Sequence, residues 1–169
     1  VGFNRRFSPH TEKLKSFLSQ PTPIVVSYRI NAGFIPPDHW TQDPEQGGGR
    51  IIGEVCHFVD LINYFTNSKP SRIFAEVLDV ANSRKDTICI ILKYPNGSVG
   101  NIIYSAIGDK AFPKERIEVF SDDSVAVIDD FKKSYFIRRG KRTQFKSSAQ
   151  DKGHSQSVNN FIQCVKGKN

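Results

Sequence analysis

The side chains best suited to proton transfer gather in one stretch of the chain, Asp43 to Asp60. Three successive glycines, Gly47, Gly48 and Gly49, directly precede an amphipathic segment. Glycines allow the main chain to approach a ligand closely, and the unpaired N–H groups at the start of a helix favour oxygens or anions. Arg50, Glu54 and His57 follow at i, i+4 and i+7, on nearly the same face of a helix. A cation, a carboxylate and an imidazole so aligned suit alcohol binding and proton transfer. From the residues alone, an Arg–Glu surface pair beside a packed histidine remains the alternative.

Regular elements surround this stretch. Ser8-Pro9 begins a helix with a capping oxygen, and residues 24–30 are rich in β-branched residues, which predicts a strand. The irregular residues 31–49 form a long loop, and apolar residues at spacings of three and four then predict a helix from Arg50 to Phe65. After Pro70 the pattern alternates, and it predicts strands over residues 72–80, 87–94, 98–107, 115–120, 125–129, 134–138 and 142–146.

Consecutive strands without helices between them predict an α+β fold, an open and mostly antiparallel sheet of six or more strands. We expect the helix of residues 50–65 and both terminal helices to pack on one face of it. The last helix, residues 155–166, would bury Val158, Phe161, Ile162 and Val165. A GxGxxG motif within a βαβ unit is absent, so the chain has no Rossmann domain of its own.

Composition narrows the class of protein. With 169 residues, 38% of them hydrophobic, the chain fits a single domain over residues 1–169 and is too apolar for a disordered polymer. It has no apolar run near 18 residues, so no membrane is expected as a partner. The net charge of +7 permits nucleic acid, but the basic residues 132–142 fit better as a solvated, edge-protecting hairpin.

Cysteine usage and the first residues bear on location and completeness. Cys56, Cys89 and Cys164 are widely spaced and form no CxxC pair, which predicts no metal site and buried thiols in the reducing cytoplasm. The chain has no methionine and opens on the interior-like Val1-Gly2-Phe3, so we expect it to be a fragment of a longer protein.

The segment from Gly47 to Asp60 resembles the C-terminal domain of the glucose–fructose oxidoreductase, inositol dehydrogenase and MocA (Gfo/Idh/MocA) family, whose helix begins GGG-x-x-x-D-x-x-x-H-x-x-D. The resemblance extends over nearly the whole chain. It implies the open-sheet fold shared with the C-terminal domains of dihydrodipicolinate reductase and glyceraldehyde-3-phosphate dehydrogenase. It further implies a parent NAD(P)-dependent dehydrogenase acting on a hydroxyl of a sugar, nucleotide-sugar or polyol.

The same resemblance assigns roles to residues. His57 matches the family's histidine, an acid/base for the substrate hydroxyl, and Glu54 is its catalytic companion. Gly53 stands where many relatives have aspartate, and Glu54 replaces that aspartate if the helix orients it inward. NAD or NADP would be bound mainly by an N-terminal domain absent from this chain, so no cofactor is expected in this fragment, which alone would be inactive. The open sheet implies a homodimer.

Further substrate-binding candidates are Arg50, Trp40, Asn31 and Lys152, with Gly47, Gly48 and Gly49 as the adjoining loop. Trp40 and Arg50 also resemble a subset fused to a zinc-dehydrogenase-like cofactor half and associated with polysaccharide genes. His10 is expected to be exposed and without a role. Two other functions stay open: a non-catalytic sugar-binding or scaffold module of the same fold, which Gly53 favours, and a nucleic-acid-binding domain, supported by charge alone.

Overall fold

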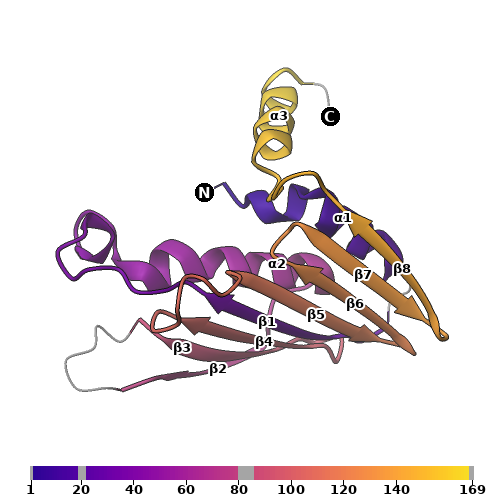
Figure 1. The fold of residues 1–169 in the computed structure, drawn as a ribbon, viewed down its shortest axis with the longest axis horizontal. Helices are drawn as coiled ribbons and strands as arrows, with labels where there is room; N and C mark the ends of the chain where they lie inside the picture. Colours follow the sequence, from indigo (N-terminus) through magenta and orange to yellow (C-terminus); the bar gives the residue numbers. More distant parts are fainter. Residues whose placement is uncertain (1, 19–21, 80–85, 168–169) are drawn as a thin grey trace.

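The computed structural model describes residues 2–18, 22–79 and 86–167. Within these residues, strands form one sheet in the order β2-β3-β4-β1-β5-β6-β7-β8 (Figure 1). Their bounds are β1 (Val25–Asn31), β2 (Arg72–Val77), β3 (Ile88–Lys93), β4 (Val99–Ser105), β5 (Glu115–Ser121), β6 (Ser124–Asp129), β7 (Lys133–Arg138) and β8 (Lys141–Lys146). β1 pairs in parallel with β4, and the other neighbouring pairs are antiparallel. The predicted α+β class and mostly antiparallel sheet are confirmed; Val80, the expected end of β2, lies outside the described residues.

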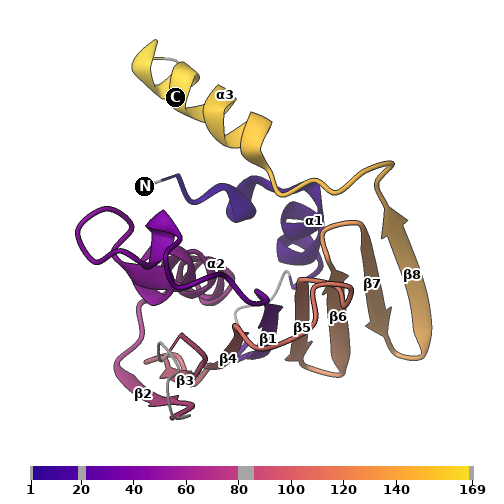
Figure 2. The ribbon, with the colours of Figure 1, turned by 60° about the vertical axis from the view of Figure 1, so that its left-hand side comes forward.

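Two α-helices cover one face of this sheet. The described helices are η1 (Asn4–Phe7), α1 (Pro9–Phe17), η2 (Trp40–Gln42), η3 (Ile51–Val55), α2 (Cys56–Thr66) and α3 (His154–Val165). Figure 2 shows α1 and α2 on the same side of the sheet, α2 over β1 and β4 and α1 over β6 and β7. The opposite face carries no described helix.

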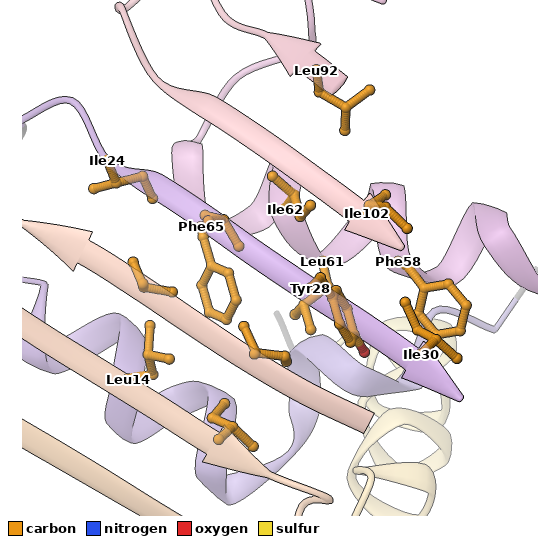
Figure 3. Close-up of a cluster of buried hydrophobic side chains, with 14 of the residues drawn as sticks. Leu14, Ile24, Tyr28, Ile30, Phe58, Leu61, Ile62, Phe65, Leu92 and Ile102 are labelled. Carbon is orange, nitrogen blue, oxygen red and sulfur yellow. The ribbon is translucent and has the colours of Figure 1, made fainter. Parts of the chain in front are cut away.

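The core fills the space between these helices and the sheet (Figure 3). Alternate residues of the inner strands point inward, as Tyr28 and Ile30 do on β1, whereas the edge strands β2 and β8 bury none. Helix α2 contributes Phe58, Leu61 and Ile62, which like Tyr28 and Ile30 are essentially without solvent exposure. Burial of this apolar surface is the main stabilising contribution. Because β1 and α2 are both anchored in the core, the loop that follows β1, from residue 32 to residue 50, has fixed end points.

The closing helix α3 differs from expectation. It projects away from the sheet next to η1, and none of its residues is buried (Figure 1). The apolar stripe predicted to be buried is instead exposed: Val158 57%, Phe161 68%, Ile162 40% and Val165 71%. The amphipathic pattern predicted the helix correctly, but a pattern does not specify what covers the apolar face.

Two other expectations are wrong. His10 is fully buried in α1: its Nδ1 lies 2.6 Å from the Ser134 hydroxyl and its Nε2 lies 3.1 Å from that of Ser147, so it ties the helix to β7 and the segment after β8. The thiols are not buried, because Cys56 is half-buried and Cys89 and Cys164 are exposed.

Candidate functional site

The three-glycine segment is shaped first by its own chain. A Cβ on Gly47 would lie 2.4 Å from the Thr41 backbone and 2.5 Å from the Trp40 carbonyl oxygen, so only glycine allows this packing. Gly48 and Gly49 have φ values of 68° and 79°, in the left-handed region that favours glycine. Gly49 has open space beside it, which leaves the loop accessible to a ligand.

The helix that follows opens as a π-helix, η3, before it continues as α2. A π-helical turn contains more residues than an α-helical one, and such turns recur at functional sites. Glu54 lies in this turn and accepts a hydrogen bond of 2.9 Å from the hydroxyl of Tyr104, a buried residue of β4. Glu54 is therefore directed toward the sheet, the orientation that the sequence analysis required of it.

His57 lies in the first turn of α2 and is half-buried. Its ring is perpendicular to that of Phe3, with the two centroids 5.6 Å apart, and its Nδ1 is buried without a hydrogen-bond partner among the described residues. Burial, and then the positive charge of Arg5, lower the pKa of His57, although Asp60, Glu115 and Glu54 act in the opposite direction. The imidazole is consequently neutral near pH 7 and able to accept a proton.

A buried network underlies this histidine. The Glu115 carboxylate, fully buried at the start of β5, accepts two hydrogen bonds from Arg5, one from the Tyr28 hydroxyl and one of 2.7 Å from Lys152. Burial alone would raise the pKa of Glu115, but the contacts with Arg5 and Lys152 outweigh it and lower this pKa to about 2. The Arg5 guanidinium also lies 4.9 Å from the Phe58 ring centroid, so η1 is fixed against α2.

The structure places the other predicted residues in different surroundings. Arg50 is buried, donates to the Gly33 carbonyl oxygen at 2.6 Å and lies 3.9 Å from an Asp86 carboxylate oxygen, so it pairs with Asp86 instead of Glu54. The Asn31 amide donates to the carbonyl oxygens of residues 109 and 112 and thereby holds that loop. Trp40 is 61% exposed, with its ring against His39.

Lys152 has 15% of its side chain exposed and is engaged by Glu115, so its ammonium group serves the buried network.

Two cavities border this region. One, of about 390 Å³, lies at Gly48 and Gly49 and includes Arg50 and Asp86 in its lining. Glu54 and His57 do not line it, so the loop and the acid/base pair do not share this cavity, contrary to the simplest form of the sequence hypothesis. The other, of about 680 Å³, lies between η1 and α3 and is lined by Phe3, which contacts His57.

Sequence reasoning missed Glu115, Tyr104 and Lys114. Lys114 precedes β5 and its Nζ lies 3.5 Å from the Glu54 carboxylate. Each is separated from its partner by tens of residues, and a polar residue in a strand pattern carries no sign of such a partner. Among the described residues, no group of three or more His, Cys, Asp or Glu side chains is arranged to hold a metal ion. None of the described helices is long and apolar enough to cross a membrane.

Together, these observations define an α+β domain in which helices cover one face of a mostly antiparallel sheet, and a glycine-led helix carries a glutamate and a histidine. Residues 18–127 match the family model described as the GFO/IDH/MocA C-terminal domain. The chain belongs to this family, as its motif predicted.

Individual proteins that resemble this chain are consistent with its membership of the family. An uncharacterized oxidoreductase, YrbE of Bacillus subtilis, is 26% identical over 139 residues, and the match covers 77% of this chain and 40% of the relative. The UDP-N-acetylglucosamine 3-dehydrogenase GnnA of Acidithiobacillus ferrooxidans superposes with a TM-score of 0.79 at 18% identity, over 100% of this chain and 53% of that one. A Clostridium difficile dehydrogenase, MviM, superposes with a TM-score of 0.77 at 19% identity, over 99% of this chain and 54% of that one. The chain thus spans about half the length of these relatives or less.

Proposed function

We propose that this chain is the substrate-binding domain of an NAD(P)-dependent oxidoreductase that acts on a hydroxyl of a sugar, nucleotide-sugar or polyol. The observation that carries the proposal is His57, a half-buried imidazole held neutral beside an inward-facing carboxylate, Glu54, on the family's glycine-led helix. Structural relatives support the substrate class, since they include a UDP-N-acetylglucosamine 3-dehydrogenase and a protein assigned as a myo-inositol dehydrogenase.

In this proposal His57 takes the proton of the substrate hydroxyl, because a hydride leaves an alcohol carbon productively only as the oxygen loses its proton. The nicotinamide of NAD or NADP would accept that hydride. Glu54 orients the hydroxyl group, and Phe3 excludes water from one edge of the imidazole. Arg50 and the neighbouring Gly48 and Gly49 bind a more distant part of the substrate from the cavity that they line.

A separate half of the parent protein would bind the cofactor. The described sheet has one parallel strand pair, β1 with β4, and no βαβ unit with a phosphate-binding glycine turn, so these residues do not fit a dinucleotide. The exposed apolar face of α3 and the 680 Å³ cavity beside it form the proposed docking surface for that half. This surface adjoins His57 through Phe3, as an active site between two halves requires.

We also propose that two copies of the chain pair through the open face of the sheet, in the cytoplasm. An apolar row crosses this face in register, from Val25 to Phe120 and on to Val125 and Ile137. The exposed fraction is 50% for Val25 and 44% for Phe120, and neighbouring exposed apolar side chains of this kind are typical of interaction surfaces. Opposite charges on the same face, such as those of the Arg116–Glu118 pair, would let the patch complement itself about a two-fold axis.

A non-catalytic sugar-binding or scaffold module is the second candidate, and Gly53 favours it because the usual aspartate is missing. A Cβ at Gly53 would meet only the Gly47 carbonyl oxygen, at 3.7 Å, an ordinary van der Waals contact, so the backbone accepts a Cβ at this position. The glycine is therefore not imposed by packing.

An activity screen separates the two candidates. The chain joined to its cofactor-binding half is incubated with NAD or NADP and a panel of glucose, myo-inositol and UDP-N-acetylglucosamine, and reduction of the nicotinamide is followed by absorbance. We expect reduction with at least one compound and none with the 169-residue chain alone. Binding of these compounds without any reduction would favour the non-catalytic module.

A further inference from the structure

Glu54 does not act as an isolated carboxylate. Its Oε2 accepts the hydrogen bond from the Tyr104 hydroxyl at 2.9 Å and lies 3.5 Å from the Lys114 ammonium nitrogen. Tyr104 comes from β4, and Lys114 directly precedes β5, so three separate elements meet at this oxygen. The same Tyr104 ring lies under the Arg50 guanidinium, at 5.4 Å from centroid to carbon, which fixes the ring in place.

Tyr104, Glu54 and Lys114 differ in solvent exposure, and this difference indicates which of them can contact a ligand. Tyr104 is buried, and burial, together with the Glu54 charge, raises the pKa of its hydroxyl, which therefore stays protonated and donates. The Glu54 and Lys114 side chains are 33% and 39% exposed. This pair thus presents a carboxylate and an ammonium group to solvent, and the Glu54 charge acts on His57, three residues further along the chain. The Glu115–Lys152 pair, 0% and 15% exposed, is closed to a ligand.

We propose that Glu54 and Lys114 together recognise two adjacent hydroxyl groups of the substrate, a vicinal diol, and that Tyr104 is the positioning residue that holds Glu54 for this purpose. This inference rests on the proposed function, and it narrows the substrate class to compounds in which the oxidised carbon has a hydroxyl-bearing neighbour.

The chemistry of the pair fits a diol. Among the described residues, no hydrogen bond reaches Glu54 Oε1, so this oxygen can accept from one hydroxyl. The Lys114 ammonium has three N–H donors, of which its long contact with Glu54 occupies one at most. A hydroxyl both donates and accepts, so adjacent hydroxyls can satisfy an acceptor and a donor lying side by side. Hydrogen bonds to charged groups are the stronger ones, which makes the pair selective.

Substrate discrimination tests the inference. Two compounds are compared: the panel compound with the highest kcat/KM, and its analogue that lacks the hydroxyl next to the oxidised carbon. The kcat/KM for each is measured with the wild type and with Lys114→Met, each joined to the cofactor-binding half. We expect the wild type to prefer the diol by about 10- to 100-fold, the usual effect of a hydrogen bond to a charged group. Lys114→Met should lose most of this preference, mainly through KM for the diol. Lys110→Met, at an exposed lysine four residues earlier, is the matched control and should keep it.

Positioning by Tyr104 has a readout that needs no cofactor. The pKa of His57 is measured by NMR in the 169-residue chain, where Arg5, Asp60 and Glu115 also act on it and stay unchanged. Glu54→Gln should lower this pKa, because a nearby negative charge is lost. Tyr104→Phe should lower it in the same direction but less, because Glu54 is then free to turn toward solvent. A Tyr104→Phe protein with the wild-type His57 pKa would overturn the positioning role.

The outcomes separate this inference from the proposed function. A wild type that oxidises a panel compound, with Lys114→Met keeping the full preference for the diol, overturns the inference and leaves the proposed function standing. Equal losses for the diol and the deoxy analogue would also overturn it, since the preference for the diol would then not depend on Lys114. A wild type that oxidises none of the compounds refutes the proposed function, and the inference with it.

Discussion

Replacing Glu115 with glutamine should destabilise the protein strongly at neutral pH and much less at acid pH. The carboxylate is fully buried and its pKa falls from the ordinary 4.5 to about 2, through Arg5 and Lys152. Each pKa unit corresponds to about 1.4 kcal/mol, so the ionised carboxylate contributes about 3 kcal/mol at pH 7. Loss of one partner of a buried ion pair typically costs about 3–5 kcal/mol, which agrees with this value.

The pH dependence follows from the sign of the shift. A carboxylate with a depressed folded-state pKa stabilises the protein above the unfolded value near 4.5, and this contribution is lost as the pH falls toward 2. At pH 3 more than half of it should be gone. The free energy of unfolding is therefore measured by urea denaturation at pH 7 and pH 3 for the wild type and Glu115→Gln. Glu118→Gln, at a partly exposed residue of the same strand, is the matched control.

The two variants should differ clearly. Glu115→Gln should lie about 3 kcal/mol below the wild type at pH 7, with the gap less than half as large at pH 3, while Glu118→Gln should change by less than about 1 kcal/mol at either pH. A Glu115→Gln protein as stable as the wild type at pH 7, or a gap that does not shrink on acidification, would refute the reasoning.

Three further experiments, with four substitutions, have defined outcomes. Gly47→Ala should lower the free energy of unfolding, measured with heat or urea, by about 1–3 kcal/mol, because its Cβ would collide with backbone at 2.4 Å. Gly53→Ala in the helix should raise it by about 0.5–1 kcal/mol, and equal effects of the two substitutions would contradict the packing described. His10→Ala should lower the free energy of unfolding by about 2 kcal/mol at pH 7. The loss should shrink as the pH falls below 6.5, because burial lowers the pKa of His10 and acid therefore already destabilises the wild type. An unchanged stability would mean that the contacts of His10 with the Ser134 and Ser147 hydroxyls are unimportant. Ile103→Asp on the open sheet face should convert a dimer to a monomer in light scattering at tens of micromolar, and a wild type that is already monomeric would remove the dimer proposal.

The strands were predictable because alternation is a local property. Each expected strand corresponds to an observed one, with bounds that differ by a few residues, since the side-chain period of two is visible along a single segment. The parallel pairing of β1 with β4 was not predictable, because it joins residues more than seventy positions apart. The burial of His10 depended likewise on Ser134 and Ser147, two distant residues.

The site was predictable only in part, for the same reason. The spacing of Glu54 and His57 is local, and the helix does carry both. The π-helical turn is not encoded in a simple period, however, and it pairs Glu54 with Tyr104 while Arg50 turns to Asp86. The apolar face of α3 was visible in the sequence, but the surface that covers such a face belongs to tertiary or quaternary structure, which no local pattern reports.

The most direct test of the catalytic role is the turnover of His57→Ala in the chain joined to its cofactor-binding half. General acid–base catalysis usually contributes about 10²- to 10⁴-fold, so kcat should fall by that factor while the dissociation constant of NAD or NADP stays nearly unchanged. A His57→Ala enzyme with wild-type kcat would show that the imidazole packs against Phe3 and takes no part in proton transfer.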